Sequence, residues 1–187
     1  MNVVIFGPPG AGKGTQAQNI VKKFNLHQVS TGDLLRTEIK NKSEIGKEIE
    51  EVISKGDFAT DNIVNKLIKN IIFDPQKKDK LIFDGYPRSL NQAKNLDLLL
   101  DSSKQKIDFI FFLNVNKDTI IKRIERRKII EKRTDDNLNT ILKRYDTYME
   151  TTRPVLDFYS LRSYFYEIDG SEKIEVISSK IEQIITV

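Results

Sequence analysis

The most informative stretch of the 187-residue chain is Val3-Val4-Ile5-Phe6-Gly7-Pro8-Pro9-Gly10-Ala11-Gly12-Lys13-Gly14-Thr15-Gln16. Its four apolar residues predict a buried strand, and a helical pattern begins at Lys13. The loop between them fits the frame Gly-x-x-x-x-Gly-Lys, in the strand, loop and helix order in which that frame binds phosphate. Glycines let backbone N–H groups turn inward around phosphate oxygens, and the helix start adds its positive dipole end. A Gly/Pro-rich turn without a ligand is the alternative, but the ordered context favours a phosphate-binding loop.

The residues around Lys13 also indicate how a metal ion would be held. Lys13 supplies a positive charge for a bound phosphate. The next position is Gly14, and a hydroxyl follows only one step later, on Thr15. We therefore expect a magnesium ion to be held mostly by phosphates and water rather than by a side-chain hydroxyl.

Short apolar runs alternate with longer helical patterns along the chain, which is typical of a parallel sheet wrapped by helices. Strands are predicted at residues 3–6, 27–29, 81–83, 108–113 and 164–168. Helices are predicted at residues 13–24, 90–100, 117–127, 136–152 and 174–185. Pro154 is expected to break or kink the helix that precedes it. The predicted fold class is α/β, with a doubly wound five-stranded parallel sheet.

The stretch from Thr31 to Phe73 has helical patterns only, interrupted near residues 42–43 and 56–61. It is too long for a simple crossover between neighbouring strands. We therefore expect it to form a helical lobe outside the sheet.

Composition and charge exclude several classes of site. The chain has no cysteine and one histidine, His27, which excludes disulfides, cysteine-ligated zinc and a histidine-rich metal centre. A formal net charge of +4 does not require a nucleic-acid partner. The first residues lack the pattern of a signal peptide, and no apolar run approaches the roughly 20 residues that cross a bilayer. We expect a cytoplasmic protein with no membrane partner and no zinc.

Five segments together give a family resemblance. They are Gly7 to Gln16, Ser30-Thr31-Gly32-Asp33-Leu34-Leu35-Arg36, Phe83-Asp84-Gly85-Tyr86-Pro87-Arg88, Arg123 to Arg127, and Arg133-Thr134-Asp135-Asp136 with Arg144. In this order and spacing they resemble the nucleoside monophosphate kinases, and the adenylate kinase family in particular. The similarity covers essentially the whole chain. Such enzymes join ATP and a monophosphate in one cleft, which gathers about six negative charges that must be neutralised and aligned.

The resemblance implies roles for the basic residues. Arginine forks hold phosphates in a two-pronged geometry, which lysine does less well. Arg36 and Arg88 would grip the AMP phosphate. Arg123 and Arg127 would contact ATP together with Lys13 and the loop from Gly10 to Thr15, namely Gly10, Ala11, Gly12, Gly14 and Thr15. Arg133 and Arg144 would contact the phosphoryl group during transfer and also line the AMP side.

The resemblance also implies the base and metal contacts. Thr31 and Gln92 would contact adenine, because a glutamine amide can donate and accept at once. The backbone of Asp57, Phe58 and Ala59 would wrap AMP, with Gly85 and Tyr86 beside it. Phe58, bulkier than the usual aliphatic residue, either packs in the core or narrows the pocket. Asp84 would orient magnesium through water, and Asp33 is either a weaker helper or a helix cap.

Only seven residues, Lys128 to Thr134, separate Arg127 from Asp135. The chain therefore resembles the short-lid form of the family, with a basic loop closing over ATP. The expected organisation is a core P-loop domain at residues 1–29, 60–127 and 135–187, an NMP-binding lobe at 30–59 and a lid loop at 128–134. A monomer is the family expectation, with ATP, AMP and ADP as the partners.

Three other functions compete with this interpretation. A UMP/CMP kinase of the same fold is the nearest, but Thr31 and Gln92 match the adenine pattern. A GTP-driven switch is disfavoured because Asn116-Lys117-Asp118 is followed by Thr119, which misses the guanine-reading motif. A nucleic-acid-binding module is disfavoured because no aromatic residues are interleaved on a basic face.

Overall fold

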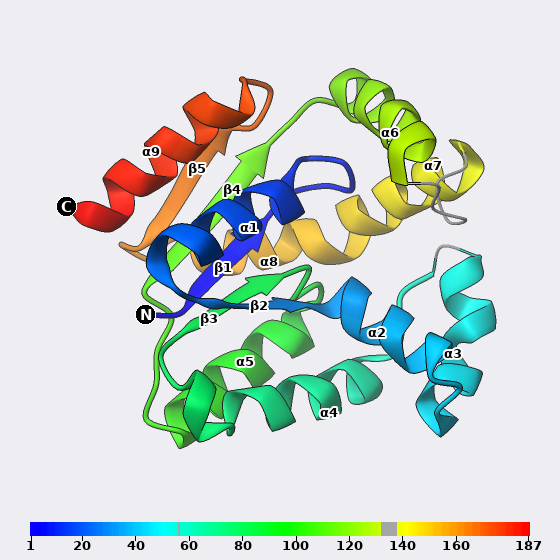
Figure 1. Cartoon of the computed structure of the whole chain (residues 1–187), viewed down its shortest axis with the longest axis horizontal. Coiled ribbons are helices and arrows are strands. Elements are labelled where there is room, and N and C mark those ends of the chain that lie inside the picture. The colour runs from blue at the N-terminus through cyan, green and yellow to red at the C-terminus, as the bar shows by residue number, and fades with distance from the viewer. Residues whose placement is uncertain (56, 132–137) are drawn as a thin grey trace.

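A single parallel sheet organises the molecule (Figure 1). The computed structural model describes residues 1–55, 57–131 and 138–187, without the side chains of residues 126–131, 138, 139 and 141. Within these ranges the strand order is β2-β3-β1-β4-β5. The strands are β1 (Val3–Phe6), β2 (His27–Ser30), β3 (Leu81–Asp84), β4 (Phe109–Asn114) and β5 (Phe165–Asp169). The predicted α/β class and five-stranded parallel sheet are confirmed.

The central strand β1 shows why the sheet is buried on both faces. All four of its residues are apolar and at most 3% exposed. Val4 and Phe6 pack into one hydrophobic cluster, while Val3 and Ile5 pack into another on the opposite face. Alternating side chains point to opposite faces of a strand, so a continuous apolar run is what a doubly covered sheet requires.

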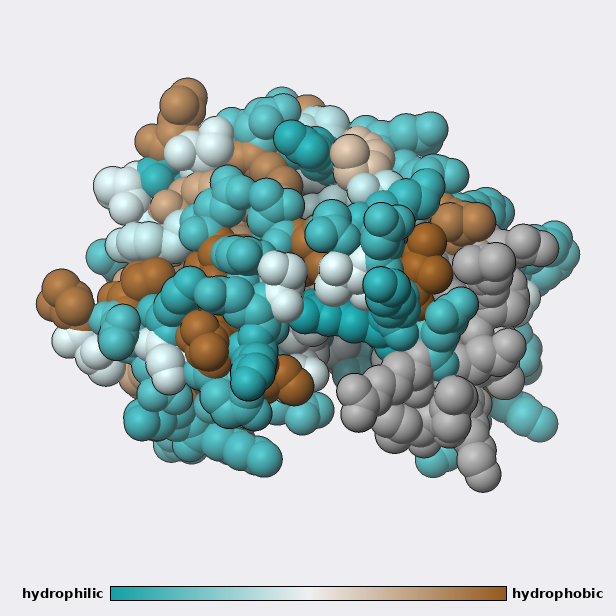
Figure 2. All heavy atoms as spheres, turned by 90° about the horizontal axis from the view of Figure 1, so that it is seen from above, coloured by the Kyte–Doolittle hydropathy of each residue, from teal (hydrophilic) through white to brown (hydrophobic). Residues whose placement is uncertain are grey.

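Helices cover both faces of the sheet (Figure 1). The cluster with Val3 and Ile5 includes residues of α1 (Lys13–Phe24), α6 (Lys117–Glu131) and α9 (Ile174–Thr186). The cluster with Val4 and Phe6 includes residues of α4 (Asp61–Ile72), α5 (Leu90–Ser102) and α8 (Arg153–Ser160). No helix in the described ranges combines the length and the apolar character of a bilayer-crossing segment. On the face in Figure 2, apolar side chains lie scattered among hydrophilic ones.

The helix-only stretch divides between a projecting lobe and the core. Helices α2 (Thr31–Lys40) and α3 (Glu44–Ser54) pack against each other at one end of the molecule (Figure 1). Helix α4, by contrast, packs on α5 and contributes Ile68 and Ile72 to the core. Only the first part of the stretch therefore projects from the sheet.

Two helices differ from the sequence expectation by more than one or two residues at an end. Helix α6 continues to Glu131, four residues beyond Arg127, because the residues that follow are charged or apolar and contain no helix breaker. The predicted long helix is instead α7 (Leu138–Thr147), a π-helical turn at Tyr148–Thr152, and α8. Pro154 lies in the first turn of α8, where a missing N–H costs no hydrogen bond.

Gly46 sets the distance between the two lobe helices. It is buried, and a Cβ there would lie far inside contact distance of the Glu38 carbonyl and 2.8 Å from the Ile39 amide nitrogen. Both neighbours are backbone atoms of α2, which cannot rotate out of the way. The Gly46→Ala variant should therefore lower the free energy of unfolding by about 1–3 kcal/mol, the usual cost of overpacking.

Urea denaturation followed by circular dichroism measures this change. Lys47→Ala, at the exposed next position of α3, is the control and should stay within about 0.5 kcal/mol of the parent. Equal stability of the Gly46→Ala variant and the control would contradict the described packing of α3 on α2.

Candidate active site

A cleft of about 1060 Å³ opens at the carboxyl edge of the sheet. All five strands run parallel, so the loops that follow them meet at this edge, where ligands bind in open α/β sheets. The cleft is lined by the loops after β1, β3 and β5 and by the start of α2. Side chains of α6 and α7 complete the lining.

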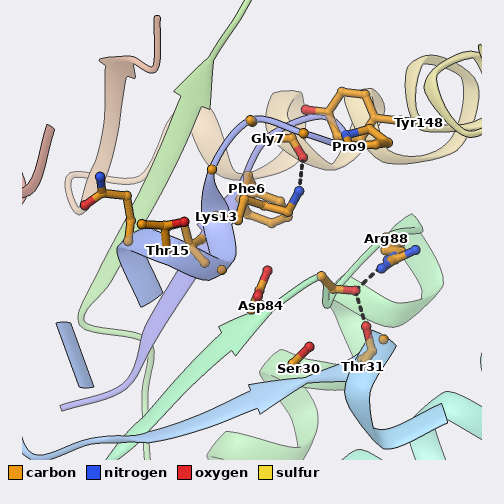
Figure 3. Close-up of a pocket in the computed structure, with 18 of the residues that line it drawn as sticks. Phe6, Gly7, Pro9, Lys13, Thr15, Ser30, Thr31, Asp84, Arg88 and Tyr148 are labelled. Carbon is orange, nitrogen blue, oxygen red and sulfur yellow. Dashed lines mark hydrogen bonds between the residues drawn. The ribbon is translucent and has the colours of Figure 1, made fainter. Parts of the chain in front are cut away.

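The loop after β1 has the backbone of a phosphate-binding loop. Gly10 and Gly12 have φ values of +82° and +94°, which residues with a side chain rarely adopt. A Cβ at Gly10 would also lie 2.7 Å from the Ile124 side chain of α6. The Nζ of Lys13 donates hydrogen bonds to the carbonyl oxygens of Gly7 (2.7 Å) and Pro8 (3.0 Å), so the ammonium lies across the loop (Figure 3).

Asp84 places a carboxylate beside this loop. It is the last residue of β3, and its Oδ2 would be 3.6 Å from a Cβ at Gly14, at the start of α1. Gln28 of β2 donates to the same oxygen at 3.1 Å. The described residues contain no cluster of three histidine, cysteine or acidic side chains that could hold a metal ion. A lone carboxylate beside a phosphate loop fits a magnesium ion held mainly by phosphates and water.

Three contacts of its guanidinium and its carbonyl fix Arg88 in the cleft, and one of them shares its acceptor with Thr31. Its Nε donates to the Gly85 carbonyl at 2.7 Å, and the Thr31 hydroxyl donates to the same oxygen at 2.7 Å (Figure 3). Its own carbonyl accepts from the Thr152 hydroxyl at 3.0 Å. The guanidinium lies 4.4 Å from the centre of the Phe58 ring. Phe58 therefore lines the cleft beneath a cation, which answers the question that the sequence left open.

Like charges converge at Arg88. Burial lowers the pKa of its guanidinium to about 10, and the positive charge of Arg144 and then that of Arg36 act in the same direction. Asp84 opposes them by stabilising the charged form. Arg36 from α2 and Arg144 from α7 thus both act on Arg88, which lies in the loop after β3. A cleft in which several cations converge favours the binding of an anion.

The lobe side of the cleft carries a second set of polar contacts. Arg36 forms an ion pair with Asp33, one helical turn before it. The helix cap of α2 is Ser30, whose hydroxyl accepts from the Asp33 amide at 3.3 Å. Asp33 is therefore not the cap itself, and its carboxylate is paired with an arginine.

The adenine-reading candidate Gln92 is buried, with 4% of its surface exposed. Its Oε1 accepts from the Arg88 amide at 2.7 Å, and its Nε2 donates to Asp61 at 2.6 Å. Gln92 lines the cleft close to Thr31 and Arg88, so the structure brings these three predicted residues together.

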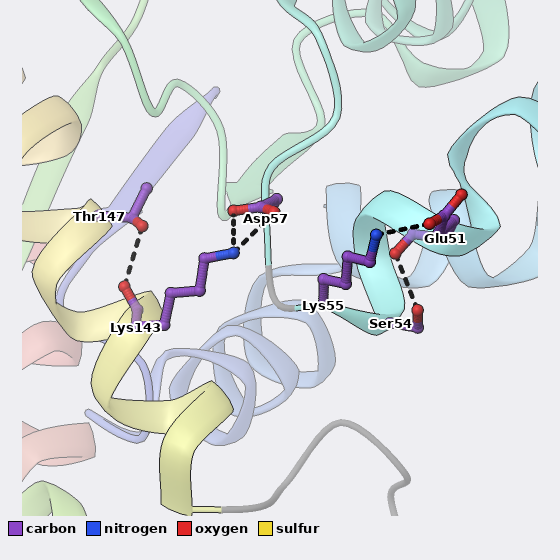
Figure 4. A network of polar contacts seen from close by, with 6 residues as sticks. All are labelled: Glu51, Ser54, Lys55, Asp57, Lys143 and Thr147. Atoms are coloured by element: carbon purple, nitrogen blue, oxygen red, sulfur yellow. Dashed lines mark hydrogen bonds and ion pairs between the residues drawn. The ribbon is translucent and has the colours of Figure 1, made fainter.

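Two contacts tie distant segments together around the cleft. Arg123 of α6 donates to the Ala11 carbonyl of the phosphate loop at 3.3 Å and to the Ser171 carbonyl after β5 at 3.4 Å. On the other side, Lys143 of α7 forms a 2.7 Å ion pair with Asp57 (Figure 4). The first contact joins α6 to the loop, and the second joins α7 to the segment that follows α3.

Most of the predicted site residues line this one cleft. They are Gly10, Ala11, Gly12, Lys13, Gly14, Thr15, Thr31, Asp33, Arg36, Asp57, Phe58, Ala59, Asp84, Gly85, Arg88, Gln92, Arg123 and Arg144. Tyr86 does not: its ring is 1% exposed within the core, and its hydroxyl donates to Asn65 at 2.8 Å. The side chain of Arg127, and Arg133 entirely, lie outside the described residues.

Sequence reasoning missed several residues of the cleft. Glu172 to Glu175 line it because β5 is parallel to the other strands, so the loop that follows reaches the same edge. The sequence could have indicated these residues, because a strand predicted to be parallel to the others places the loop after it at the same edge of the sheet. Tyr148 also lines the cleft, and its buried hydroxyl has no hydrogen-bond partner among the described residues. No sequence pattern marks it, because it lies in the π-helical turn.

Known proteins are similar in sequence to this chain over most or all of its length. The family model described as Adenylate kinase matches residues 5–164. An adenylate kinase of Pelagibacter ubique is 47% identical, with all of both chains covered. An adenylate kinase of Caulobacter sp. (strain K31) is 37% identical over 100% of this chain and 99% of its own. One of Mycoplasma mycoides subsp. mycoides is 38% identical over 92% of each chain.

The alignments also differ in length. The Pelagibacter alignment runs over 213 positions against the 187 residues of this chain, a difference of 26. The Caulobacter alignment runs over 187 positions. Because the family model matches most of the chain and these relatives are covered almost from end to end, the chain belongs to the adenylate kinase family.

Proposed function

We propose that this chain transfers the terminal phosphoryl group of MgATP to AMP, giving two ADP, in a reversible reaction that serves adenine nucleotide homeostasis. The observation that carries the proposal is the convergence of Arg36, Arg88 and Arg144 next to a phosphate-binding loop, in one cleft large enough for two nucleotides. A cleft with a phosphate loop alone would suit many nucleotide-binding proteins. The second cationic centre is what a second phosphorylated substrate requires.

The ATP side consists of the phosphate loop and α6. The loop from Gly10 to Thr15 would surround the triphosphate with backbone N–H groups, and Lys13 would move from the Gly7 and Pro8 carbonyls to the phosphates. Arg123, already hydrogen-bonded to the loop, would contact ATP, joined by Arg127.

The AMP side consists of α2, the segment before α4, and the loop after β3. Arg36 and Arg88 would hold the AMP phosphate, and Arg36 would exchange Asp33 for that phosphate. Thr31 and Gln92 would contact adenine, while the backbone of residues 57–59 and Gly85 would surround the nucleotide. Arg133 and Arg144 would complete the phosphate contacts.

In the transfer itself an oxygen of the AMP phosphate attacks the terminal phosphorus of ATP. A new P–O bond forms, the bond to the β-phosphate oxygen breaks, and the leaving group is ADP. The arginines and Lys13 act by alignment and by neutralising charge that spreads over the phosphoryl oxygens. Magnesium bound together with ATP would supply further positive charge to the phosphates, and Asp84 is the side chain that would orient its water ligands.

We further propose that residues 128–134 act as a short lid, between a core at 1–29, 60–127 and 135–187, with residues 30–59 as the NMP-binding lobe. The 26-position difference from the Pelagibacter relative supports a shortened form of the fold. Residues 128–131 belong to α6, so the lid would begin within that helix. Closure over ATP would exclude water and suppress hydrolysis. The proposal includes a monomer that acts in the cytoplasm.

One assay tests the substrate. Purified protein is supplied with ATP and, in parallel, AMP, UMP, CMP or GMP, with and without magnesium. We expect ADP to form rapidly only with AMP and magnesium. Faster turnover of UMP or CMP than of AMP would establish a pyrimidine nucleotide kinase of the same fold and overturn the adenylate assignment.

Arg88→Ala tests the cationic centre. The variant removes the guanidinium on which two other arginines converge, so kcat should fall roughly 100-fold or more, as for loss of one transition-state donor. Steady-state kinetics with saturating ATP and AMP measure the change.

Lys106→Ala is the matched control, because Lys106 is a cation on the surface at the far end of the sheet, beside the start of β4. It should leave kcat within about twofold of the parent. Near-normal turnover of the Arg88→Ala variant would remove Arg88 from the proposed role.

A further inference from the structure

We propose that Asp61 sets the base specificity of the AMP side by fixing the orientation of the Gln92 amide. Asp61 would thereby admit a purine that presents a donor at C6 and an acceptor at N1, and reject one that presents the reverse. The inference rests on the proposed function, because it assigns to the same cleft the means of choosing between two purine monophosphates.

The orientation of the Gln92 amide is determined by its two partners. The Nε2 of Gln92 donates to Oδ1 of Asp61 at 2.6 Å, and its Oε1 accepts from the Arg88 amide at 2.7 Å. A carboxylate can only accept and a backbone N–H can only donate. Rotation of the amide by 180° would face oxygen to carboxylate and NH₂ to N–H. Both hydrogen bonds would become repulsive contacts in a buried position, which disfavours the flipped state.

Asp61 is itself held in place. It is the first residue of α4, and its Oδ2 accepts from the Ser89 hydroxyl at 2.8 Å. The same hydroxyl caps α5 by accepting a hydrogen bond from the backbone N–H of Gln92 at 3.1 Å. Asp61, Ser89 and Gln92 therefore form a closed ring of hydrogen bonds between the starts of α4 and α5. The carboxylate has little freedom to follow a rotated amide.

Two hydrogen-bonding positions of Gln92 remain for a ligand. The amide group has two N–H donors and two acceptor positions on its oxygen, and one of each is already used. Gln92 lines the cleft, whereas Asp61 is not among its described lining residues. Asp61 thus lies behind the glutamine and acts through it, as a positioning residue.

The remaining donor and acceptor match one type of base edge. Adenine presents a C6 amino donor next to an N1 acceptor, so the donor faces Oε1 and the acceptor faces Nε2. Hypoxanthine has the same size and shape but presents a C6 carbonyl and an N1–H, which reverses the order. It would be matched only by the flipped amide, which Asp61 and the Arg88 amide oppose. A comparison of IMP with AMP therefore tests the orientation of the Gln92 amide without a change in the size of the base.

The test is the ratio of kcat/KM for AMP to that for IMP. Asp61→Asn keeps the shape of the side chain but can present either an oxygen or an NH₂ to Gln92, so the flipped amide regains a partner. We expect the ratio to fall about tenfold or more, the usual scale of one charged hydrogen bond. KM for IMP should account for most of the fall, with kcat for AMP little changed.

Asp61→Ala is a second variant and should shift the ratio in the same direction, because it removes the carboxylate that opposes the flip. Asp118→Asn is the matched control: it removes the same charge from the first turn of another helix, α6, at an exposed position. That control should retain the parent ratio. Thermal denaturation establishes that each variant is folded at the assay temperature.

A double-mutant cycle distinguishes positioning from a general effect on the fold. In a Gln92→Ala background, Asp61→Asn should leave the AMP-to-IMP ratio unchanged. A further fall in that background, or a ratio within twofold of the parent in a folded Asp61→Asn or Asp61→Ala variant, would overturn the inference. Failure of the parent protein to phosphorylate AMP would instead overturn the proposed function, and the inference with it.

Discussion

Mutual repulsion among guanidinium groups is the constraint that the site has to overcome. Arg36, Arg88 and Arg144 come from three separate segments, and the positive charges of Arg144 and Arg36 add to the effect of burial in lowering the pKa of Arg88. Bringing like charges together in a half-buried cleft is unfavourable, and the energy must come from packing elsewhere in the fold. The doubly covered sheet supplies it, because β1 and β3 are almost wholly inaccessible to solvent. A phosphate bound as proposed would offset the repulsion, so binding of the proposed substrate would be favoured by charge that the fold already holds in place.

A few backbone groups keep this arrangement in position. The Gly85 carbonyl accepts hydrogen bonds from both Thr31 and Arg88, so a residue proposed to read the base and one proposed to hold phosphate share one anchor. The Arg88 amide in turn orients Gln92. Base and phosphate recognition are therefore built on the same short loop after β3. A shift of that loop would therefore alter the proposed base contacts and the proposed phosphate contacts together.

Local patterns in the sequence were sufficient for the fold and the phosphate loop, whereas most of the other cleft residues were expected through the family resemblance. The apolar run at Val3 to Phe6, followed by the Gly-x-x-x-x-Gly-Lys frame, predicted β1, its loop and α1 to the residue. The contacts of Asp61 and the place of Tyr148 in the cleft could not be predicted, since they depend on packing between elements far apart in sequence. Asp61 is 31 residues from Gln92. For Tyr86 the sequence motif suggested a place in the site, yet its side chain is buried in the core.

The close approach of Ile124 to Gly10 brings together the phosphate loop and α6, which are more than 100 residues apart in the sequence. Ile124 occupies the space that a side chain at position 10 would need, and Arg123 beside it is hydrogen-bonded to the Ala11 carbonyl. Helix α6 and the phosphate loop are therefore packed directly against each other at this point. A bend of α6 on the N-terminal side of Ile124 would separate both Arg123 and Ile124 from the loop, so a change in the position of the helix and a change in the shape of the loop are not independent.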